Sequence, residues 1–246
     1  MPLYQYVKIK PKNGIKIPRY FPFLLISIGS AILLWVVWPI ISFSLFTAPL
    51  FAKTISPVPE FKPINQAGGD IVTNIFAQTS IDSDKTKFSD FTNANIWFPT
   101  KPQKKIVAPV NSYTLTIPKL KISNALVIIA GDDLNKGLIH YGGTALPGTY
   151  GNAVIFGHST LPQFFNPINY RTIFSTLPTI KIGDEIIVTF DNVTYTYSVY
   201  DLAVTEPSDL SILEQRFDDS YVTLITCVPP GTYLKRLAVR GKLKRI

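Results

Sequence analysis

The chain has 246 residues, of which 46% are hydrophobic and 16% are charged, and its formal net charge is +8. Its single cysteine, Cys227, excludes a disulfide within the chain and a cysteine-rich metal site. Two histidines are too few for a histidine-rich metal cage, so we expect no metal ion and no cofactor. The basic residues crowd the two ends of the chain and follow no nucleic-acid-binding motif, so we expect no nucleic-acid partner.

The N-terminal part of the sequence is typical of a membrane anchor. Residues 1–19 form a basic arm without acidic residues, and residues 20–52 contain no charged residue. About 20 apolar residues are enough to cross a bilayer as a helix. A cleaved signal peptide is the alternative, but its apolar region would be shorter, about 7–15 residues. We therefore predict a single uncleaved span, with a cytoplasmic N-terminus and the rest of the chain outside the cell.

Residues 53–110 differ in composition from the segments on either side. They are first rich in proline and glycine, then polar without a clear period, and then again interrupted by prolines. This composition predicts an extended extracytoplasmic stalk or linker. Within it, the stretch FSDFTNANIWF, residues 88–98, is a candidate to pack on the following domain or to cover its cleft.

From residue 111 to residue 246 the sequence consists of short apolar or alternating segments separated by turn residues. Strands are predicted over residues 113–117, 125–130, 151–158, 184–190, 193–204, 221–226 and 233–243. The pair Asp191-Asn192 predicts a hairpin turn. Only residues 170–177 and 209–217 look helical, and both segments are short. Many short strands with few helices predict a mainly β domain, either a barrel or a sandwich.

Three polar residues lie at or beside the ends of predicted strands, where a rigid scaffold commonly presents reactive groups. Cys227 supplies a potential nucleophile and His158 a potential proton shuttle. Arg236 stays charged and cannot act as a base, so it would hold a carbonyl or stabilise negative charge. Leu237 and Val239 alternate with Arg236, which predicts that Arg236 faces away from the apolar core. The plainer alternative for Cys227 is a buried structural thiol.

Three segments resemble, in content and in order, the sortases, which are membrane-anchored cysteine transpeptidases of bacterial surfaces. They are HYGGTALPGTYGNAVIFGHST, TIKIGDEIIV, and TLITC followed by VPPGTYLKRLAV. The resemblance covers roughly residues 112–246, and the N-terminal anchor agrees with it. Features of pilus-type members and of housekeeping or sporulation-type members both occur. The Asp-Pro-aromatic lid motif of pilus-type members is not found.

The resemblance implies a closed eight-stranded β-barrel over residues 111–246 and a role for each matched residue. Cys227 would attack the carbonyl of a threonine in a C-terminal LPxTG-like sorting signal and form a thioacyl-enzyme. His158 would protonate the departing amine and deprotonate the incoming one, and Arg236 would orient the substrate and support the oxyanion. Thr226 would help to line the substrate site. The acceptor amine would come from a peptidoglycan peptide or from a lysine of another surface protein.

Two other functions are weighed against this one. An L,D-transpeptidase of the cell wall would carry a His-Gly-Cys cluster, whereas His158 and Cys227 lie far apart in this sequence. A non-enzymatic membrane-anchored surface protein, or a silent relative, should lack one of the three polar residues. His140 matches a histidine that recurs in some sortases, and a structural hydrogen-bonding role is an equal alternative for it. Asp132, Asp133 and Asp184 are interpreted as turn residues.

Overall fold

The computed structural model describes residues 20–43, 45, 92–97, 101, 103–104 and 108–245. The chain divides into two units, residues 1–38 and 39–246, which are described separately. Helix α1, Phe21–Ser42, is long and apolar enough to cross a membrane. It is compatible with the predicted anchor. The predicted basic arm and most of the predicted stalk lie outside the described residues.

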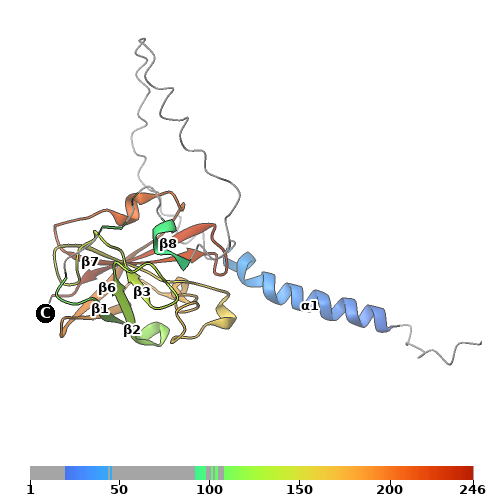
Figure 1. Cartoon of the computed structure of the whole chain (residues 1–246). Helices are drawn as coiled ribbons and strands as arrows, with labels where there is room; N and C mark the ends of the chain where they lie inside the picture. The colour runs from blue at the N-terminus through green and yellow to red at the C-terminus, as the bar shows by residue number, and fades with distance from the viewer. Residues whose placement is uncertain are drawn as a thin grey trace, which may run out of the picture. The chain divides into compact units, whose positions relative to one another are not determined.

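Eight strands close into a barrel in the order β1-β2-β3-β4-β7-β8-β6-β5 (Figure 1). Their bounds are β1 Ser112–Ile117, β2 Ile122–Ile129, β3 Leu138–His140, β4 Gly151–Phe156, β5 Glu185–Phe190, β6 Val193–Thr205, β7 Ser220–Val228 and β8 Lys235–Leu243. The closed barrel confirms the fold class expected from the sequence.

Most neighbouring strands are antiparallel, but β2–β3 and β4–β7 are parallel pairs. The β5–β6 hairpin turns at Asp191 and Asn192, whose φ angles of 48° and 62° fit the predicted two-residue turn. A parallel pair needs a long crossover connection. The connection between β4 and β7 therefore includes the whole β5–β6 hairpin, and it brings distant parts of the sequence side by side.

The sheet formed by β4, β7 and β8 is covered on both faces. On β7 and β8, Val222, Leu224, Leu237 and Val239 belong to the large hydrophobic cluster that fills the barrel. Alternate residues of the same strands point outward into a second apolar cluster that includes Cys227. Two short 3-10 helices contribute to this outer cluster: η4, Ala94–Trp97, and η8, Leu210–Leu213. Every residue of β7 is consequently buried.

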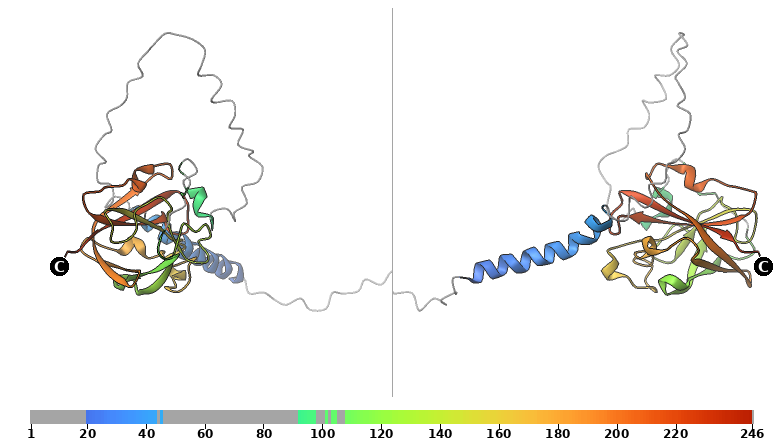
Figure 2. Two further views of the ribbon diagram at one scale, coloured as in Figure 1. Left: turned by 60° about the vertical axis from the view of Figure 1, so that its left-hand side comes forward. Right: turned by 180° about the vertical axis from the view of Figure 1, so that it is seen from behind.

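The predicted strands are all present, but three local details differ from the sequence interpretation. Strand β3 was not predicted, and its short length gives no measurable period. Residues 170–177 are not a helix but successive turns followed by a 3-10 helix, η7, Leu177–Thr179 (Figure 2). Here the Thr172 hydroxyl lies within hydrogen-bonding distance of the carbonyl oxygens of Asn166 and Asn169, which favours a turn over a helix. Residues 209–217 form a 3-10 helix only over η8.

Gly157 separates the end of β4 from His158, and its lack of a side chain is required by packing. A Cβ atom at this position would lie 2.4 Å from Cδ2 of Phe174 and 2.7 Å from Cδ2 of Leu138. We expect Gly157→Ala to lower the free energy of unfolding by about 1–3 kcal/mol, because both side chains would have to move. Thermal unfolding of the full chain in detergent, followed by circular dichroism, measures this loss. Ser112→Ala, an exposed change on β1, is the control and should have little effect.

Candidate active site

The antiparallel register of β7 and β8 places Cys227 directly opposite Arg236. The Nη1 atom of Arg236 donates to Sγ of Cys227 at 3.4 Å. Arg236 faces away from the barrel interior, as the alternation with Leu237 and Val239 predicted. It is nevertheless only 3% exposed, and Cys227 is 2% exposed, because the outer face of the sheet is itself covered here.

The parallel register of β4 and β7 brings His158 to the same end of the sheet as Cys227. The Gly157 amide donates to the Ile225 carbonyl at 3.1 Å, and the Ser159 hydroxyl donates to the Cys227 carbonyl at 2.7 Å. His158 lies between these two links, so it is level with the thiol. Neighbouring strands are about 4.8 Å apart, so the two residues are neighbours across the sheet. The three residues singled out in the sequence therefore lie on adjacent strand ends.

Thr226 is placed differently from its neighbour Cys227. Successive residues of a strand point to opposite faces, so the Thr226 side chain points into the barrel and not toward the thiol. It is fully buried, and its hydroxyl donates to the Gly157 carbonyl at 2.8 Å. This bond links β7 to the residue before His158. The structure thus connects Thr226 to the positioning of the histidine rather than to the surface beside the thiol.

Trp97 of η4 covers the outer face of the sheet at Arg236, and it is 2% exposed. The Arg236 guanidinium carbon lies 4.8 Å from the centre of the indole ring, and the His158 ring centre lies 6.1 Å from it. Backbone hydrogen bonds from the Ala94 amide to the Asp132 carbonyl and from the Leu134 amide to the Thr92 carbonyl hold η4 in place. Figure 1 shows η4, in green, beside β8. Residues 92–97 of the predicted stalk therefore pack on the domain.

Burial keeps both reactive side chains uncharged near neutral pH. It raises the pKa of the Cys227 thiol to about 11, although the positive charge of Arg236 opposes this shift. It lowers the pKa of His158 to about 4; Arg171 lowers this pKa further, and Asp133 opposes the shift. The covered site therefore holds a neutral thiol and a neutral imidazole, not an ion pair.

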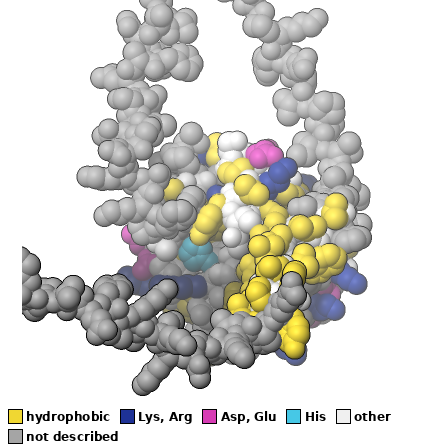
Figure 3. Space-filling view, turned by 90° about the vertical axis from the view of Figure 1, so that its right-hand side faces the viewer, with side chains coloured by type: hydrophobic (Ala, Val, Ile, Leu, Met, Phe, Trp, Pro, Cys, Tyr) yellow, Lys and Arg dark blue, Asp and Glu magenta, His cyan; other side chains and the backbone are white. Residues whose placement is uncertain are grey.

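Two polar atoms of the site remain free for a ligand. Nε2 of His158 and Nε of Arg236 are buried without a hydrogen-bond partner in the described part of the chain. A buried polar atom without a partner costs free energy, which a substrate carbonyl or amine would recover by bonding to it. Figure 3 shows a histidine side chain on one face of the molecule, with hydrophobic and basic side chains near it in that view.

His140 does not belong to this group. It is fully buried, and its Nδ1 and Nε2 atoms lie 2.8 Å from the Tyr113 hydroxyl and 3.3 Å from the Thr144 hydroxyl. Its ring packs edge-on against Tyr113, which is part of the barrel core. Both ring nitrogens have partners, so the structural alternative describes His140 better than a catalytic one.

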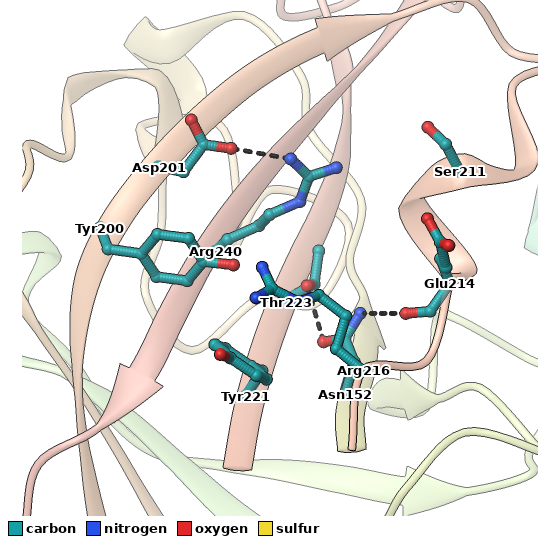
Figure 4. Close-up of a pocket in the computed structure, with 9 residues that line it drawn as sticks. All are labelled: Asn152, Tyr200, Asp201, Ser211, Glu214, Arg216, Tyr221, Thr223 and Arg240. Carbon is teal, nitrogen blue, oxygen red and sulfur yellow. Dashed lines mark hydrogen bonds and ion pairs between the residues drawn. The ribbon is translucent and has the colours of Figure 1, made fainter. Parts of the chain in front are cut away.

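A second polar pocket, of about 300 Å³, lies further along the same outer face of β7 and β8 (Figure 4). Thr223, opposite Arg240 in the sheet, lies four residues before Cys227 and is bonded to Asn152 at 2.8 Å. Arg240 is paired with Asp201 at 2.7 Å. Thr223 and Asn152 are thus hydrogen-bonded to each other, and Arg240 and Asp201 form an ion pair. The buried side chains of η8, which lies beside this pocket, belong to the apolar cluster that also contains Cys227.

This chain is similar in sequence to known proteins of one family. Residues 115–244, more than half of the chain, match the family described as Sortase domain. The chain belongs to the sortase family. Sortase D of Bacillus subtilis strain 168 is 28% identical over 134 residues, which cover 52% of this chain and 61% of that protein. The chain thus matches less than two thirds of this relative's length. Family membership favours the sortase resemblance over the L,D-transpeptidase alternative.

Solved sortase structures are also similar to this chain. A Clostridium perfringens Sortase D5 transpeptidase is 28% identical, with a TM-score of 0.47, and the match covers 57% of this chain and 83% of that one. Sortase C-1 from Actinomyces oris is 30% identical, with a TM-score of 0.48, and the match covers 57% and 76%. The matched sortases carry different class letters, so no subclass is assigned.

The cover over the thiol predicts how Cys227 reacts with a small alkylating reagent. Trp97→Ala would let water reach the thiol, lower its pKa and raise the fraction of thiolate at pH 7. We expect alkylation of the full chain in detergent at pH 7 to become at least about tenfold faster, since one pKa unit corresponds to a factor of about ten. Mass spectrometry measures the rate at this one cysteine.

Trp97→Phe retains an aromatic cover and serves as the matched control for Trp97→Ala. Its alkylation rate should stay near that of the unaltered chain, and in both proteins the rate should rise with pH toward the high thiol pKa. Equal rates for Trp97→Ala and the unaltered chain at every pH would contradict a cover that controls the thiol.

The buried histidines predict a loss of stability in acid. The pKa of His140 is lowered by burial from 6.5 to about 4, as is that of His158. The unfolded chain therefore binds more protons between these values, so stability falls as the pH falls from about 6.5 toward 4. We expect each histidine to contribute about 2 kcal/mol to this loss between pH 7 and pH 5.

Thermal unfolding of the full chain at a series of pH values tests this expectation. His140→Asn should remove about half of the pH dependence between pH 7 and pH 5, and His158→Asn should remove a similar share. If neither variant changes the slope, the two imidazoles are not buried in the neutral form.

Proposed function

We propose that this chain is a membrane-anchored cysteine transpeptidase. It would cleave a C-terminal LPxTG-like sorting signal of a surface protein and join the new carboxyl end to an amine. The observation that carries the proposal is the contact between the Arg236 guanidinium and the only thiol of the chain, beside a histidine that follows the adjacent strand. Membership of the sortase family supports it.

In the first step, Sγ of Cys227 attacks the carbonyl carbon of the substrate threonine. A carbon–sulfur bond forms, the carbon–nitrogen bond breaks, and the thiol proton passes through His158 to the leaving amine. Arg236 keeps its charge throughout, so it stabilises both the thiolate and the negative oxygen of the tetrahedral intermediate. Its free Nε is a donor available for that oxygen.

In the second step, an amine attacks the thioester. His158 takes a proton from the amine, the new carbon–nitrogen bond forms, and the carbon–sulfur bond breaks. The proton then returns to the sulfur of Cys227, which restores the resting enzyme. Thr226 acts in this scheme as a positioning residue, because its hydroxyl bonds to the carbonyl of Gly157, next to His158.

Substrate binding requires a movement of η4. With Trp97 in place the Cys227 side chain is almost fully covered, so a peptide carbonyl cannot reach the sulfur. Displacement of the indole would also rehydrate the thiol and lower its pKa. Access and activation of the nucleophile would then occur together.

The location follows from the anchor. Helix α1 would hold the enzyme in the membrane, with the basic residues before it on the cytoplasmic side and the barrel outside. The partners would be surface proteins with a sorting signal, and the acceptor amine would belong to peptidoglycan or to a second surface protein.

Incubation of the full chain in detergent with a panel of LPxTG-like peptides tests the activity. We expect mass spectrometry to show cleavage after threonine and an adduct when an amine such as triglycine is added. Cys227→Ala should abolish both products. Arg236→Lys should lower kcat at least about 100-fold, because removal of one hydrogen-bond donor to the oxyanion typically lowers kcat by about this factor.

Thermal unfolding of Arg236→Lys, which should stay close to that of the unaltered chain, separates loss of activity from loss of folding. Arg236→Lys should still be alkylated at Cys227. An unaltered chain that is folded and has a reactive thiol, but gives no product with any peptide, would contradict the proposed reaction with this class of substrate.

A further inference from the structure

A polar pocket of about 480 Å³ adjoins His158. It is lined on one side by His158, Ser159 and Thr160, which follow β4, and on the other by Asn135 and Arg171. Its described lining contains a guanidinium but no carboxylate. The pocket therefore places a guanidinium next to the residue that exchanges protons with the amine of the substrate, with the Asp133 carboxylate behind Asn135.

The Arg171 guanidinium is held in a fixed orientation but not neutralised. Its Nε donates to Oδ1 of Asn135 at 2.9 Å. Asn135 is itself held by Asp133, whose Oδ1 accepts from the Asn135 side-chain and backbone nitrogens at 3.1 Å and 3.0 Å. Because only Nε is used, the two terminal nitrogens of Arg171 keep their donors. In the described part of the chain no carboxylate forms an ion pair with Arg171.

Three other arginines of the domain have such a partner, whereas Arg236 contacts the Cys227 thiol instead. Arg216 pairs with Asp218, Arg240 with Asp201 and Arg245 with Asp219. A guanidinium with both terminal nitrogens free matches the two oxygens of a carboxylate, which it binds through two parallel hydrogen bonds. The arrangement at Arg171 thus points to an anionic ligand with the geometry of a carboxylate.

The place of the pocket identifies the molecule that would carry this carboxylate. His158 gives a proton to the leaving amine and takes one from the entering amine, so both amines must occupy the same position beside it. A pocket that adjoins His158 is consequently on the amine side of the bond that is broken and remade. We propose that this pocket is the acceptor subsite, and that Arg171 binds a free carboxylate carried by the acceptor amine. This inference rests on the proposed transpeptidase function.

A carboxylate would distinguish the acceptor from the leaving peptide. The leaving peptide continues past the point where a short acceptor such as glycine or triglycine ends, so it has an amide where the acceptor has a carboxylate. Binding at Arg171 would therefore favour transfer to the acceptor over reattachment of the leaving peptide. The charge of Arg171 lowers the pKa of His158, and a bound carboxylate would offset that charge. The other charged or titratable groups that face His158, namely Asp133, Cys227 and Arg236, would keep their effect. The carboxylate would therefore make the imidazole a stronger base.

Arg171 is exposed and does not touch the reacting atoms in this scheme, so it acts as a positioning residue. The transfer step that Arg171 assists needs no further reagent. The acceptor nitrogen attacks the thioester carbon, the carbon–sulfur bond breaks, and the amine proton passes through His158 to the Cys227 sulfur.

The test compares acceptors that differ only in the carboxylate. The full chain in detergent is given a cleavable donor peptide with glycine or glycinamide, and with triglycine or triglycinamide. Arg171→Gln should raise KM for the acids at least about tenfold, because it removes a charged hydrogen-bonding partner. It should leave KM for the amides unchanged. Arg171→Lys, which retains the charge but not the paired donors, should fall between.

Arg216→Gln is the matched control, since Arg216 is also exposed and lies in the other pocket. Arg216→Gln should change KM neither for the acids nor for the amides. Equal effects of Arg171→Gln on acids and amides, or no effect on either while hydrolysis continues, would overturn the acceptor subsite and leave the transpeptidase proposal standing.

If the donor peptide is not cleaved at all, the proposed function fails. Whether Arg171 binds a carboxylate can then still be tested by measuring ligand binding directly. In Cys227→Ala, the Arg171 side-chain NMR signal should shift saturably with triglycine and not with triglycinamide. The same response to both ligands, or to neither, would overturn the role of Arg171.

Discussion

The parallel pairing of β4 with β7 determines where the candidate catalytic residues of this domain meet. It sets the residue after Gly157 level with Cys227, and the antiparallel pairing of β7 with β8 adds Arg236 on the other side. Because side chains alternate between faces, a shift of either register by one residue would turn one of these groups into the barrel. The hydroxyls of Thr226 and Ser159 reinforce the register through bonds across the β4–β7 pair.

Desolvation is the second constraint on the site. A strand end at the edge of a barrel would ordinarily be wet, yet η4 and η8 bury the outer face of the sheet here. The burial moves the two pKa values in opposite directions, away from the charged forms that nucleophilic attack requires. Arg236 opposes this effect at the sulfur. In the proposed mechanism the covered thiol is therefore unreactive, and it becomes reactive when the cover is displaced.

The surroundings of the thiol and the histidine differ in character. Apart from Arg236, Cys227 belongs to an apolar cluster that includes Trp97 and Phe156, whose rings pack against each other. Beside His158 the pocket is polar and open, and it carries the unneutralised charge of Arg171. This asymmetry fits a reaction with two substrates, in which an acyl group stays at the sulfur while one amine replaces another at the imidazole.

The sequence by itself indicated seven of the eight strands, an apolar segment long enough for an anchor, and the three polar residues that the barrel brings together. The alternation of apolar and basic residues in β8 indicated on which face of the sheet Arg236 lies, because successive side chains of a strand point to opposite faces whatever the rest of the fold. The stretch of residues 88–98 was a candidate to cover a cleft, but nothing in the sequence placed Trp97 over Arg236, from which it lies far along the chain. Nor did the sequence single out Arg171, whose surroundings come from Asn135 and the end of β4. Only the tertiary structure decided these features, because burial and charge pairing depend on contacts between segments that the barrel closure brings together.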